Sequence, residues 1–161
     1  MTDRWLPPEE YIETIARATS YACLYFTDTA GRPFQLRSRD EAEVWQWPGG
    51  NLEHGETPWE GARRECLEET GIDFRGPRRL LGVHFLPRRT RWPVNHIGFI
   101  FDGGELTDVQ LARVRLTDEH TEWRVATVEG WRGQMRPDGF ARLDAISTAR
   151  ATGAVAYLEG A

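Results

Sequence analysis

The sequence predicts a single α/β domain in which helices are the minority. Its 161 residues are enough for one domain with a hydrophobic core, and 40% hydrophobic with 28% charged residues is an ordinary globular mixture. One segment has clear helix start and stop signals, whereas several others are rich in β-branched and aromatic residues. No repeat or linker divides the chain, so we expect one domain over 1–161, with 1–18 as an N-terminal helical extension.

The first elements are predicted from proline, acidic residues and β-formers. Residues 7–18 suggest a short helix, because a proline can occupy the first turn and acids follow it. Residues 20–28 and 34–39 flank the turn sequence TAGRP, so together they predict a hairpin. The segment DEAEVWQWPGG then enters a loop with a Pro-Gly-Gly turn.

The helix at 58–70 has the best-defined ends. Thr57 and Glu60 form a T-x-x-E capping box, and Pro58 occupies the first helical position. Gly71 directly follows Thr70 and supplies the stop.

Further strands are predicted at 78–87, 95–106 and 122–129. A basic, aromatic loop, 88–94, separates the first two of them. Apolar residues over 136–153 recur at roughly helical spacing, so this segment predicts a closing helix.

Charge and cysteine usage exclude several classes of protein. A net charge of −5 and a pI of about 5.4 provide no global basic field for nucleic acid or an anionic membrane, although a local basic patch is compatible with them. No secretory signal pattern and no apolar stretch of membrane-spanning length is present. Cys23 and Cys66 form no metal-binding motif, and we expect buried, reduced thiols in a cytoplasmic protein.

Three glutamates crowd one side of the 58–70 helix. At about 100° per residue, Glu65, Glu68 and Glu69 share an arc of about 100°, beside the predicted buried stripe of Trp59, Ala62, Cys66 and Thr70. Like charges four residues apart cost a few tenths of a kcal/mol, and the only nearby cation, Arg64, is expected to point to a different side. The cluster is therefore either a solvated acidic face or a site for a divalent cation.

The cation interpretation has a chemical basis. Mg²⁺ prefers carboxylate oxygens and is usually shared between protein carboxylates, water and substrate phosphates. A backbone carbonyl of the Gly-Gly turn can add a further oxygen, because glycine lets the backbone come close. The PGG segment and the helix would then face one site.

The spacing of these residues resembles the Nudix box, G-x5-E-x7-R-E-U-x-E-E-x-G-U, where U is a bulky apolar residue. All seven fixed positions match: Gly50, Glu56, Arg64, Glu65, Glu68, Glu69 and Gly71. Cys66 at the first U position is the one departure, and cysteine behaves as a small buried hydrophobe. The resemblance implies a single Nudix hydrolase domain, an α/β/α sandwich around a mixed, mainly antiparallel curved sheet.

The resemblance also implies an activity. Nudix proteins typically hydrolyse a nucleoside diphosphate linked to another group X; water attacks a phosphorus, and Mg²⁺ or Mn²⁺ assists. By position, Glu65, Glu68 and Glu69 would bind the metal and serve catalysis, together with the carbonyl of Gly49. Gly50 and Gly71 would be structural box residues, and so would Glu56 and Arg64, whose pair would brace the loop against the helix.

Residues outside the box are further candidates. Relatives often use an additional glutamate, for which Glu119 is preferred over Glu122, with a surface charge as the alternative. Arg39, and next to it Arg37, would bind phosphate, unless they are a solvated strand end. In the 88–94 loop, a phosphate clamp would use Arg88, Arg89 or Arg91, and a base would stack on Trp92; an exposed hairpin loop is the alternative.

Several functions remain open at this point. The substrate could be a damaged nucleoside triphosphate, a nucleotide sugar, a dinucleoside polyphosphate or a capped RNA end; the acidic pI weighs against long RNA. A non-catalytic nucleotide sensor on the same fold would tend to lose box glutamates, and a prenyl diphosphate isomerase would need a different setting for Cys23. Homodimers are common in the family, and Trp5 and Tyr11 could pack on a neighbour.

Overall fold

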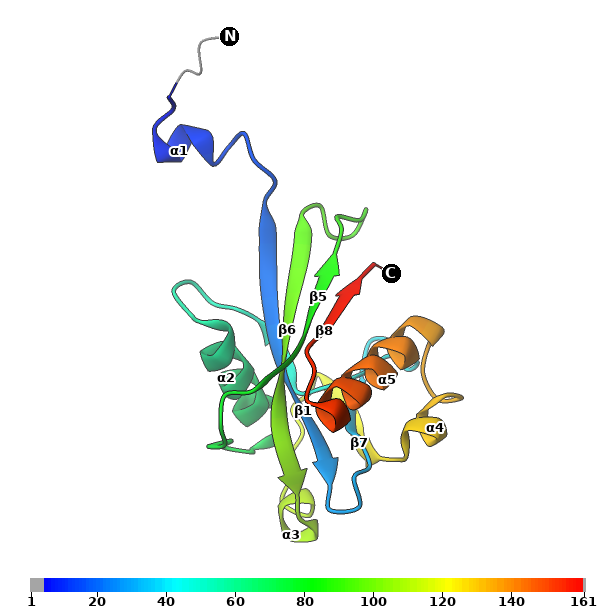
Figure 1. Cartoon of the computed structure of the whole chain (residues 1–161). Helices are drawn as coiled ribbons and strands as arrows, with labels where there is room; N and C mark the ends of the chain where they lie inside the picture. Colours follow the sequence, from blue (N-terminus) through cyan, green and yellow to red (C-terminus); the bar gives the residue numbers. More distant parts are fainter. Residues whose placement is uncertain (1–4, 161) are drawn as a thin grey trace.

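Two β-sheets and two long helices form the computed structural model, which describes residues 5–160 (Figure 1). The strands are β1 Ala18–Asp28, β2 Phe34–Ser38, β3 Trp45–Gln46, β4 Gly49–Asn51, β5 Leu80–Leu86, β6 Asn95–Leu106, β7 His120–Val125 and β8 Ala156–Glu159. The helices are α1 Pro8–Tyr11, α2 Pro58–Thr70, α3 Asp108–Leu111, α4 Val128–Trp131 and α5 Pro137–Thr152.

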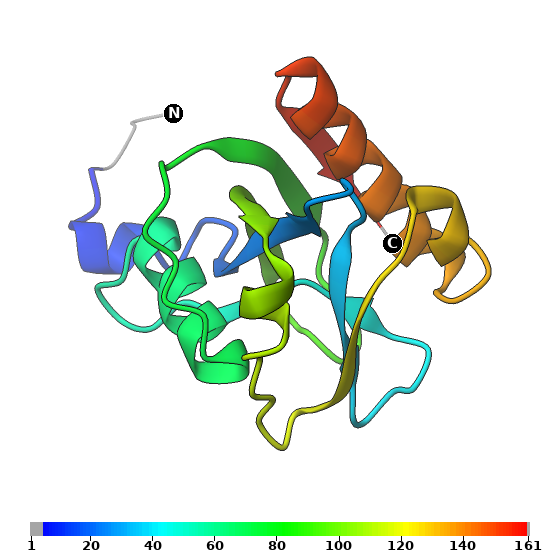
Figure 2. The ribbon, with the colours of Figure 1, turned by 90° about the horizontal axis from the view of Figure 1, so that it is seen from below.

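The larger sheet has five strands in the order β4-β1-β6-β5-β8, and the smaller has the order β3-β2-β7. Strand β1 runs parallel to β6 and antiparallel to β4, and all pairs of the smaller sheet are antiparallel. The helices α2 and α5 lie on opposite sides of the larger sheet (Figures 1 and 2). The mixed sandwich expected from the sequence is confirmed.

Alternation along β1 explains the two layers of core. Leu24 and Phe26 pack in one cluster with Cys66 of α2, whereas Tyr25 packs in the other with Leu143 of α5. Successive side chains of a strand point to opposite faces of a sheet. The central strand therefore ties both helices to one sheet.

The predicted hairpin of 20–28 and 34–39 is wrong, although its turn is present. The Asp28 carboxylate accepts hydrogen bonds from the backbone amides of Ala30 and Arg32, which fixes the turn. Beyond a single bridge next to the turn, β1 and β2 belong to different sheets. Strand β2 instead pairs with β3 and β7, while β1 pairs with β6 along its length and with β4 at Tyr21–Cys23.

The predicted helix 7–18 is also much shorter than expected. Helix α1 is a single turn, and β1 already begins at Ala18. Large apolar side chains in this segment, such as Tyr11 and Ile12, are exposed, and Figure 1 shows α1 standing away from the sheets. A short helix without packing is marginal in water, which explains the difference.

Helix α2 begins and ends where the sequence predicts. The Thr57 hydroxyl accepts from the Glu60 amide, and the Glu60 carboxylate accepts from the Thr57 amide at 2.9 Å. Gly71 adopts φ 75°, the left-handed conformation that ends helices. The preceding Pro-Gly-Gly segment, predicted as a turn, instead leads into the edge strand β4.

The shortest elements were missed, although Thr107 and Gln110 form a capping box that marks the start of α3. Helices α3 and α4 and strands β3 and β8 were not predicted, and the strand expected at 122–129 ends at Val125. Within residues 5–160, no helix is long and apolar enough to cross a membrane.

Candidate active site

Two glycines bring the edge strand β4 into close contact with its neighbours. A Cβ on Gly49 would overlap the carbonyl oxygen of Ala22 and the side chain of Cys23 in β1. A Cβ on Gly50 would lie 2.5 Å from Oε1 of Glu65 in α2. Glycine is needed at position 49, where a Cβ would meet backbone, and at position 50 it lets the PGG segment lie directly against the first box glutamate.

Glu69 is the most buried carboxylate of the box. Its side chain accepts a hydrogen bond from the Gly49 amide at 2.8 Å, and the residue is 4% exposed. Burial, together with the negative charges of Glu65, Glu119 and Glu68, raises its pKa to about 8, against the hydrogen bond from Gly49. Burial also raises the pKa of Glu65. The carboxylates thus lie close enough to disfavour one another's charge.

Arg64 does not point away from the glutamates, as the sequence led us to expect. Its Nε donates to Glu56 at 2.7 Å, and Nη2 donates to Glu56 and to the Asn51 carbonyl at 3.0 Å each. Its Nη1 lies 3.0 Å from Glu65 and 3.1 Å from Glu68. A long guanidinium side chain reaches both neighbours on the helix surface. The expected Glu56–Arg64 pair is present, and the same cation partly neutralises the acidic face.

Glu119, just before β7, and Glu122, within β7, have different surroundings. The carboxylate of Glu119 is one of the charges that raise the pKa of both Glu65 and Glu69. Glu122, in contrast, pairs with Arg37 at 3.2 Å and with Arg124 at 2.7 Å. Of the two candidates, only Glu119 therefore has a box-facing setting.

His120 was not singled out as a site residue, yet it lies against the box. It is buried, with Nε2 3.6 Å from Oε1 of Glu69 and 2.9 Å from Nε2 of Gln46. Its Nδ1 has no hydrogen-bond partner within the described chain. Burial lowers its pKa, so a neutral imidazole faces Glu69. An alternating strand pattern could have indicated burial but not this contact.

The arginines before the box are engaged with the protein. Arg37 pairs with Glu122 and donates to the Ala42 carbonyl at 2.8 Å. Arg39 donates to the carbonyl of Asp118, and its amide donates to Glu119 at 2.9 Å. Both side chains hold the segment that carries Glu119.

The 88–94 loop forms a separate surface feature. Trp92 donates from Nε1 to Thr19 at 2.8 Å and packs on the ring of His96 at 4.9 Å. Trp92 is 39% exposed, and within residues 5–160 the Arg91 side chain forms no hydrogen bond or ion pair. This loop borders a small apolar hollow that also includes Leu86 and Pro87.

The candidate ligands are chemically suited to a divalent metal ion. Carboxylates and a glycine carbonyl are hard oxygen donors, and buried acids whose charges oppose one another are relieved by a cation. In their present rotamers, no group of three His, Cys, Asp or Glu side chains within residues 5–160 is gathered closely enough to hold a metal. Glu65 and Glu68 turn toward Arg64, and Glu69 turns toward Gly49.

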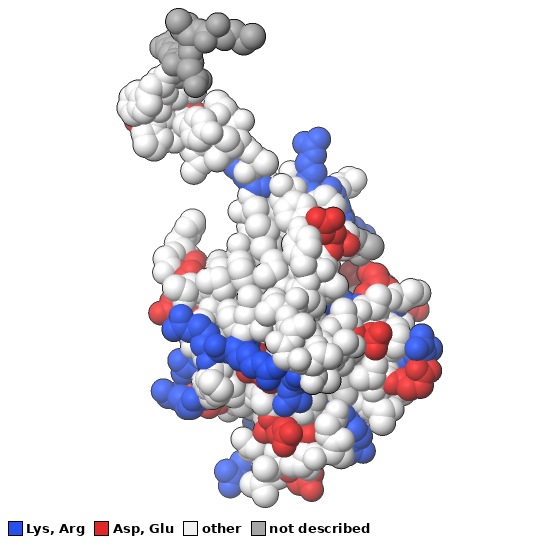
Figure 3. Space-filling view, in the orientation of Figure 1, with Lys and Arg blue, Asp and Glu red and all other residues white. Residues whose placement is uncertain are grey.

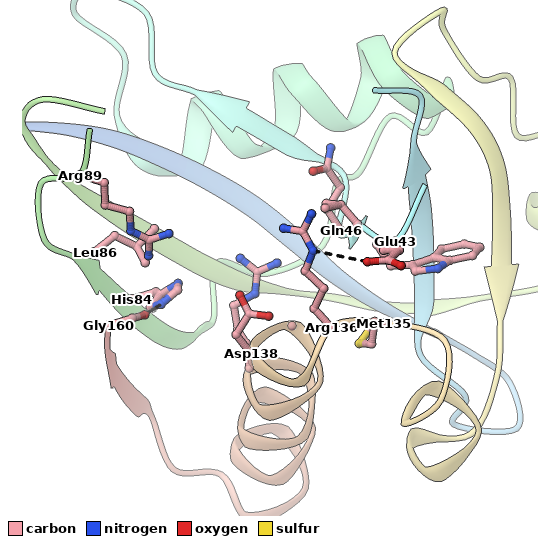
Figure 4. A pocket seen from close by; sticks show the side chains of 13 residues that line it. Glu43, Gln46, His84, Leu86, Arg89, Met135, Arg136, Asp138 and Gly160 are labelled. Atoms are coloured by element: carbon pink, nitrogen blue, oxygen red, sulfur yellow. Dashed lines mark hydrogen bonds and ion pairs between the residues drawn. The ribbon is translucent and has the colours of Figure 1, made fainter. Parts of the chain in front are cut away.

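A pocket of about 260 Å³ opens between α5, β3 and β5 (Figure 4). Side chains of three arginines and two acids contribute to its wall: Arg89, Arg136, Arg142, Glu43 and Asp138. A smaller cavity of about 80 Å³ shares Gln46 and Arg142 with it and reaches Gly49. The pocket therefore leads toward the box, and the sequence did not single out Gln46 and Arg142, which line both cavities.

Comparison with known proteins gives the family. The model of the NUDIX domain matches residues 16–143. The chain belongs to the Nudix family. An RNA pyrophosphohydrolase of Rhodospirillum rubrum is 30% identical over 118 residues, which cover 62% of this chain and 66% of that protein. An RNA pyrophosphohydrolase of Rhodopseudomonas palustris is 52% identical over 33 residues, which cover 20% of this chain and 19% of that protein.

Solved Nudix structures have the same fold. The MutT protein of Methanosarcina mazei matches with a TM-score of 0.64 and 25% identity, covering 80% of this chain and 94% of its own. A C. elegans Ap4A hydrolase matches with a TM-score of 0.63 and 20% identity, and the match covers 83% of this chain and 98% of that chain. The curated relatives are matched over at most two thirds of their length, and the first over about a fifth.

Proposed function

We propose that this Nudix protein is a metal-dependent pyrophosphohydrolase, in which water attacks a phosphorus of a nucleoside diphosphate linked to another group. One observation carries the proposal: Glu65 and Glu69 lie against the glycine pair Gly49–Gly50, with Glu119 close enough to raise the pKa of both. This acidic cluster has the chemistry of a Mg²⁺ site, with Glu65, Glu68, Glu69 and the Gly49 carbonyl as ligands. Mn²⁺ has similar ligand preferences.

The protein side chains would divide the work. A divalent cation supplies neutralisation of charge on the phosphate oxygens when bound. Glu119 and the box carboxylates are the groups able to accept a proton from the attacking water. His120, 3.6 Å from Glu69, would hold the Glu69 carboxylate in position. Arg64 connects helix α2 to the preceding loop through Glu56 and to β4 through the Asn51 carbonyl.

Relatives named RNA pyrophosphohydrolases favour RNA among the substrate candidates expected from the sequence. The net negative charge, which argued against nucleic acid, is unevenly distributed. Figure 3 shows positive side chains in a band over the face that carries α2 and β5, and the segment joining them reads RGPRR at 75–79. A local basic surface is thus compatible with a polyanionic substrate.

A phosphate-release screen with Mg²⁺ tests the activity. It would compare ADP-ribose, diadenosine tetraphosphate, nucleoside triphosphates and a 5′-triphosphorylated RNA oligonucleotide. Release from none of them by the wild type would refute the proposal. A Glu68→Gln or Glu69→Gln variant that keeps turnover within about threefold of wild type would refute the metal assignment, because losing one transition-state carboxylate usually costs far more.

The alternative is a nucleotide-binding sensor on the same fold. It is distinguished by saturable nucleotide binding in the complete absence of turnover. All four box glutamates are retained, Glu56, Glu65, Glu68 and Glu69, which favours the enzyme.

A further inference from the structure

Helix α5 presents an arginine, Arg142, for which no ion pair is seen in the part of the chain that the structure describes. Within residues 5–160, Arg142 takes part in no ion pair, whereas Arg150 of the same helix pairs with Asp102 at 3.1 Å and Arg136 pairs with Glu41. The guanidinium of Arg142 lies 4.8 Å from the ring centre of Trp47. An aromatic face holds a cation without cancelling its charge.

Two other side chains near Arg142, Tyr21 and His84, are neutral. The Tyr21 hydroxyl is 3.0 Å from Nδ1 of His84, and Nε2 of His84 is 3.1 Å from the carbonyl oxygen of Gly160. A carbonyl can only accept, so Nε2 carries the proton and Tyr21 donates to Nδ1. Burial lowers the pKa of His84, which keeps it neutral. The oxygen lone pairs of Tyr21 are then available to orient Arg142.

Trp47 supplies a second donor without a partner. The residue is 3% exposed, and its indole Nε1–H has no hydrogen-bond acceptor within the described chain. Trp47 and Arg142 line the same small cavity. A buried donor left unpaired is destabilising, so a ligand oxygen in this cavity would satisfy it.

The location of the cavity connects it to the proposed reaction. Gly49 lines it, and the Gly49 amide donates to Glu69 of the box. Arg142 and Gln46 also line the larger pocket, where Arg89 adds a second arginine without an ion pair among the described residues. Figure 4 shows Arg89 beside His84 and Leu86 at the β5 side of this pocket, while Arg136 faces Glu43.

Charge balance then restricts the substrate. The carboxylates of the box and a divalent cation account for the diphosphate that would be hydrolysed. Arg142 and Arg89 line the adjoining pocket and are available to bind an additional anion; of the acids in its wall, Glu43 is near Arg136, which leaves Asp138 to oppose them. A neutral sugar would leave these charges and the Trp47 donor without partners.

We propose that Arg142 and the indole N–H of Trp47 bind a phosphoryl group beyond the hydrolysed diphosphate. The preferred substrate therefore bears three or more phosphates, or an X group that is itself phosphorylated, rather than a neutral X group such as ribose. This inference rests on the proposed pyrophosphohydrolase function.

The test compares substrates that differ in this group. Steady-state kinetics would use diadenosine tetraphosphate and a 5′-triphosphorylated dinucleotide against ADP-ribose, for wild type, Arg142→Ala, Arg142→Lys and Trp47→Phe. Arg142→Ala should lower kcat/KM for the phosphate-rich compounds about 10- to 100-fold, mainly through KM, since a hydrogen bond to a charged group is lost. For ADP-ribose the change should stay within about threefold. Arg142→Lys should be intermediate, because it keeps the charge but loses the planar fork.

Arg113→Ala is the matched control. Arg113 is exposed after α3, forms no ion pair within the described chain, and its removal changes the net charge by the same amount. Its kinetics should equal those of wild type. Equal losses on all three compounds in Arg142→Ala, or no loss on any, would overturn the proposal, and thermal melting separates a folding defect from a binding defect.

A binding measurement keeps this inference separate from the activity. Calorimetric titration with inorganic tripolyphosphate in Mg²⁺ should show binding to wild type, about tenfold or more weaker binding to Arg142→Ala, and about three- to tenfold weaker binding to Trp47→Phe. If these affinities are found but no compound is hydrolysed, the proposed hydrolase function is refuted and the proposed anion site stands. If Arg142→Ala binds tripolyphosphate as tightly as wild type, the proposed anion site is refuted, whatever the hydrolytic activity.

Discussion

The contacts of Arg64 predict a strong energetic coupling between the box helix and the segment before it. Its guanidinium donates to both Glu56 oxygens, at 2.7 and 3.0 Å, and to the Asn51 carbonyl at 3.0 Å. Glu56 in turn accepts from the Glu53 amide at 2.9 Å. The perturbation is Arg64→Gln and Glu56→Gln, made singly and together.

The size of the effect follows from the partial burial of the pair. The side chains are 23% and 16% exposed, between a surface pair worth about 0–1 kcal/mol and a buried pair whose disruption costs about 3–5 kcal/mol. Arg64→Gln should therefore destabilise the protein by about 2–4 kcal/mol, which corresponds to a fall in Tm of about 4–16 °C for a domain of this size. Glu56→Gln should cost less, about 1–2 kcal/mol, because Arg64 keeps Glu65 and Glu68 as partners.

Urea denaturation of the four proteins measures the coupling directly. The double-mutant cycle should give an interaction energy of about 1.5–3 kcal/mol between the two positions. Arg63→Gln is the control, because Arg63 precedes Arg64 in the helix but contacts Asp73, at 3.6 Å, and the Phe74 carbonyl, at 2.7 Å, instead of Glu56. A coupling below about 0.5 kcal/mol would refute the view that this pair braces the site, because independent positions add within that margin.

Three further predictions concern the box helix and the buried thiols. In EDTA, stability should fall as pH rises from the unfolded pKa of Glu69, about 4.5, toward its folded value of about 8, because the folded state retains the proton that the unfolded state releases. Glu69→Gln should therefore stabilise the metal-free protein at pH 8. Glu68→Gln should not, because the Glu68 side chain is 56% exposed. Urea denaturation at pH 5 and pH 8 measures this, and the same response in both variants would contradict it. Burial raises the pKa of Cys23 and Cys66 to about 12, so both thiols should be silent to a disulfide reagent at pH 8 until urea is added, and rapid labelling of the native protein would be incompatible with the packing. Thr57→Ala should cost about 1 kcal/mol in urea denaturation through loss of the helix cap, and no measurable loss would contradict the capping geometry.

The box helix shows how far local sequence can predict structure. The start at Pro58, the end at Thr70 and the Gly71 cap were all predicted, since capping depends on residues a few positions apart. The burial of Cys66 was likewise predicted from helical periodicity. The position of Glu69, by contrast, was predicted only as beside the core boundary. It is buried, because Gly49 of β4 packs against its carboxylate.

The sequence by itself determined the family, the box and the chemical character of the acidic cluster, because the box spacing is local and its residue types are specific. Tertiary structure alone decided that β1 and β2 separate into two sheets, since strand partners are chosen by free edges and not by adjacent sequence. It also decided that Arg64 neutralises the box helix and that Arg142, 77 residues after Glu65, lines a cavity bounded by the box segment. Contacts of such long range leave no spacing pattern in one chain, and they depend on how α5 packs across the sheet.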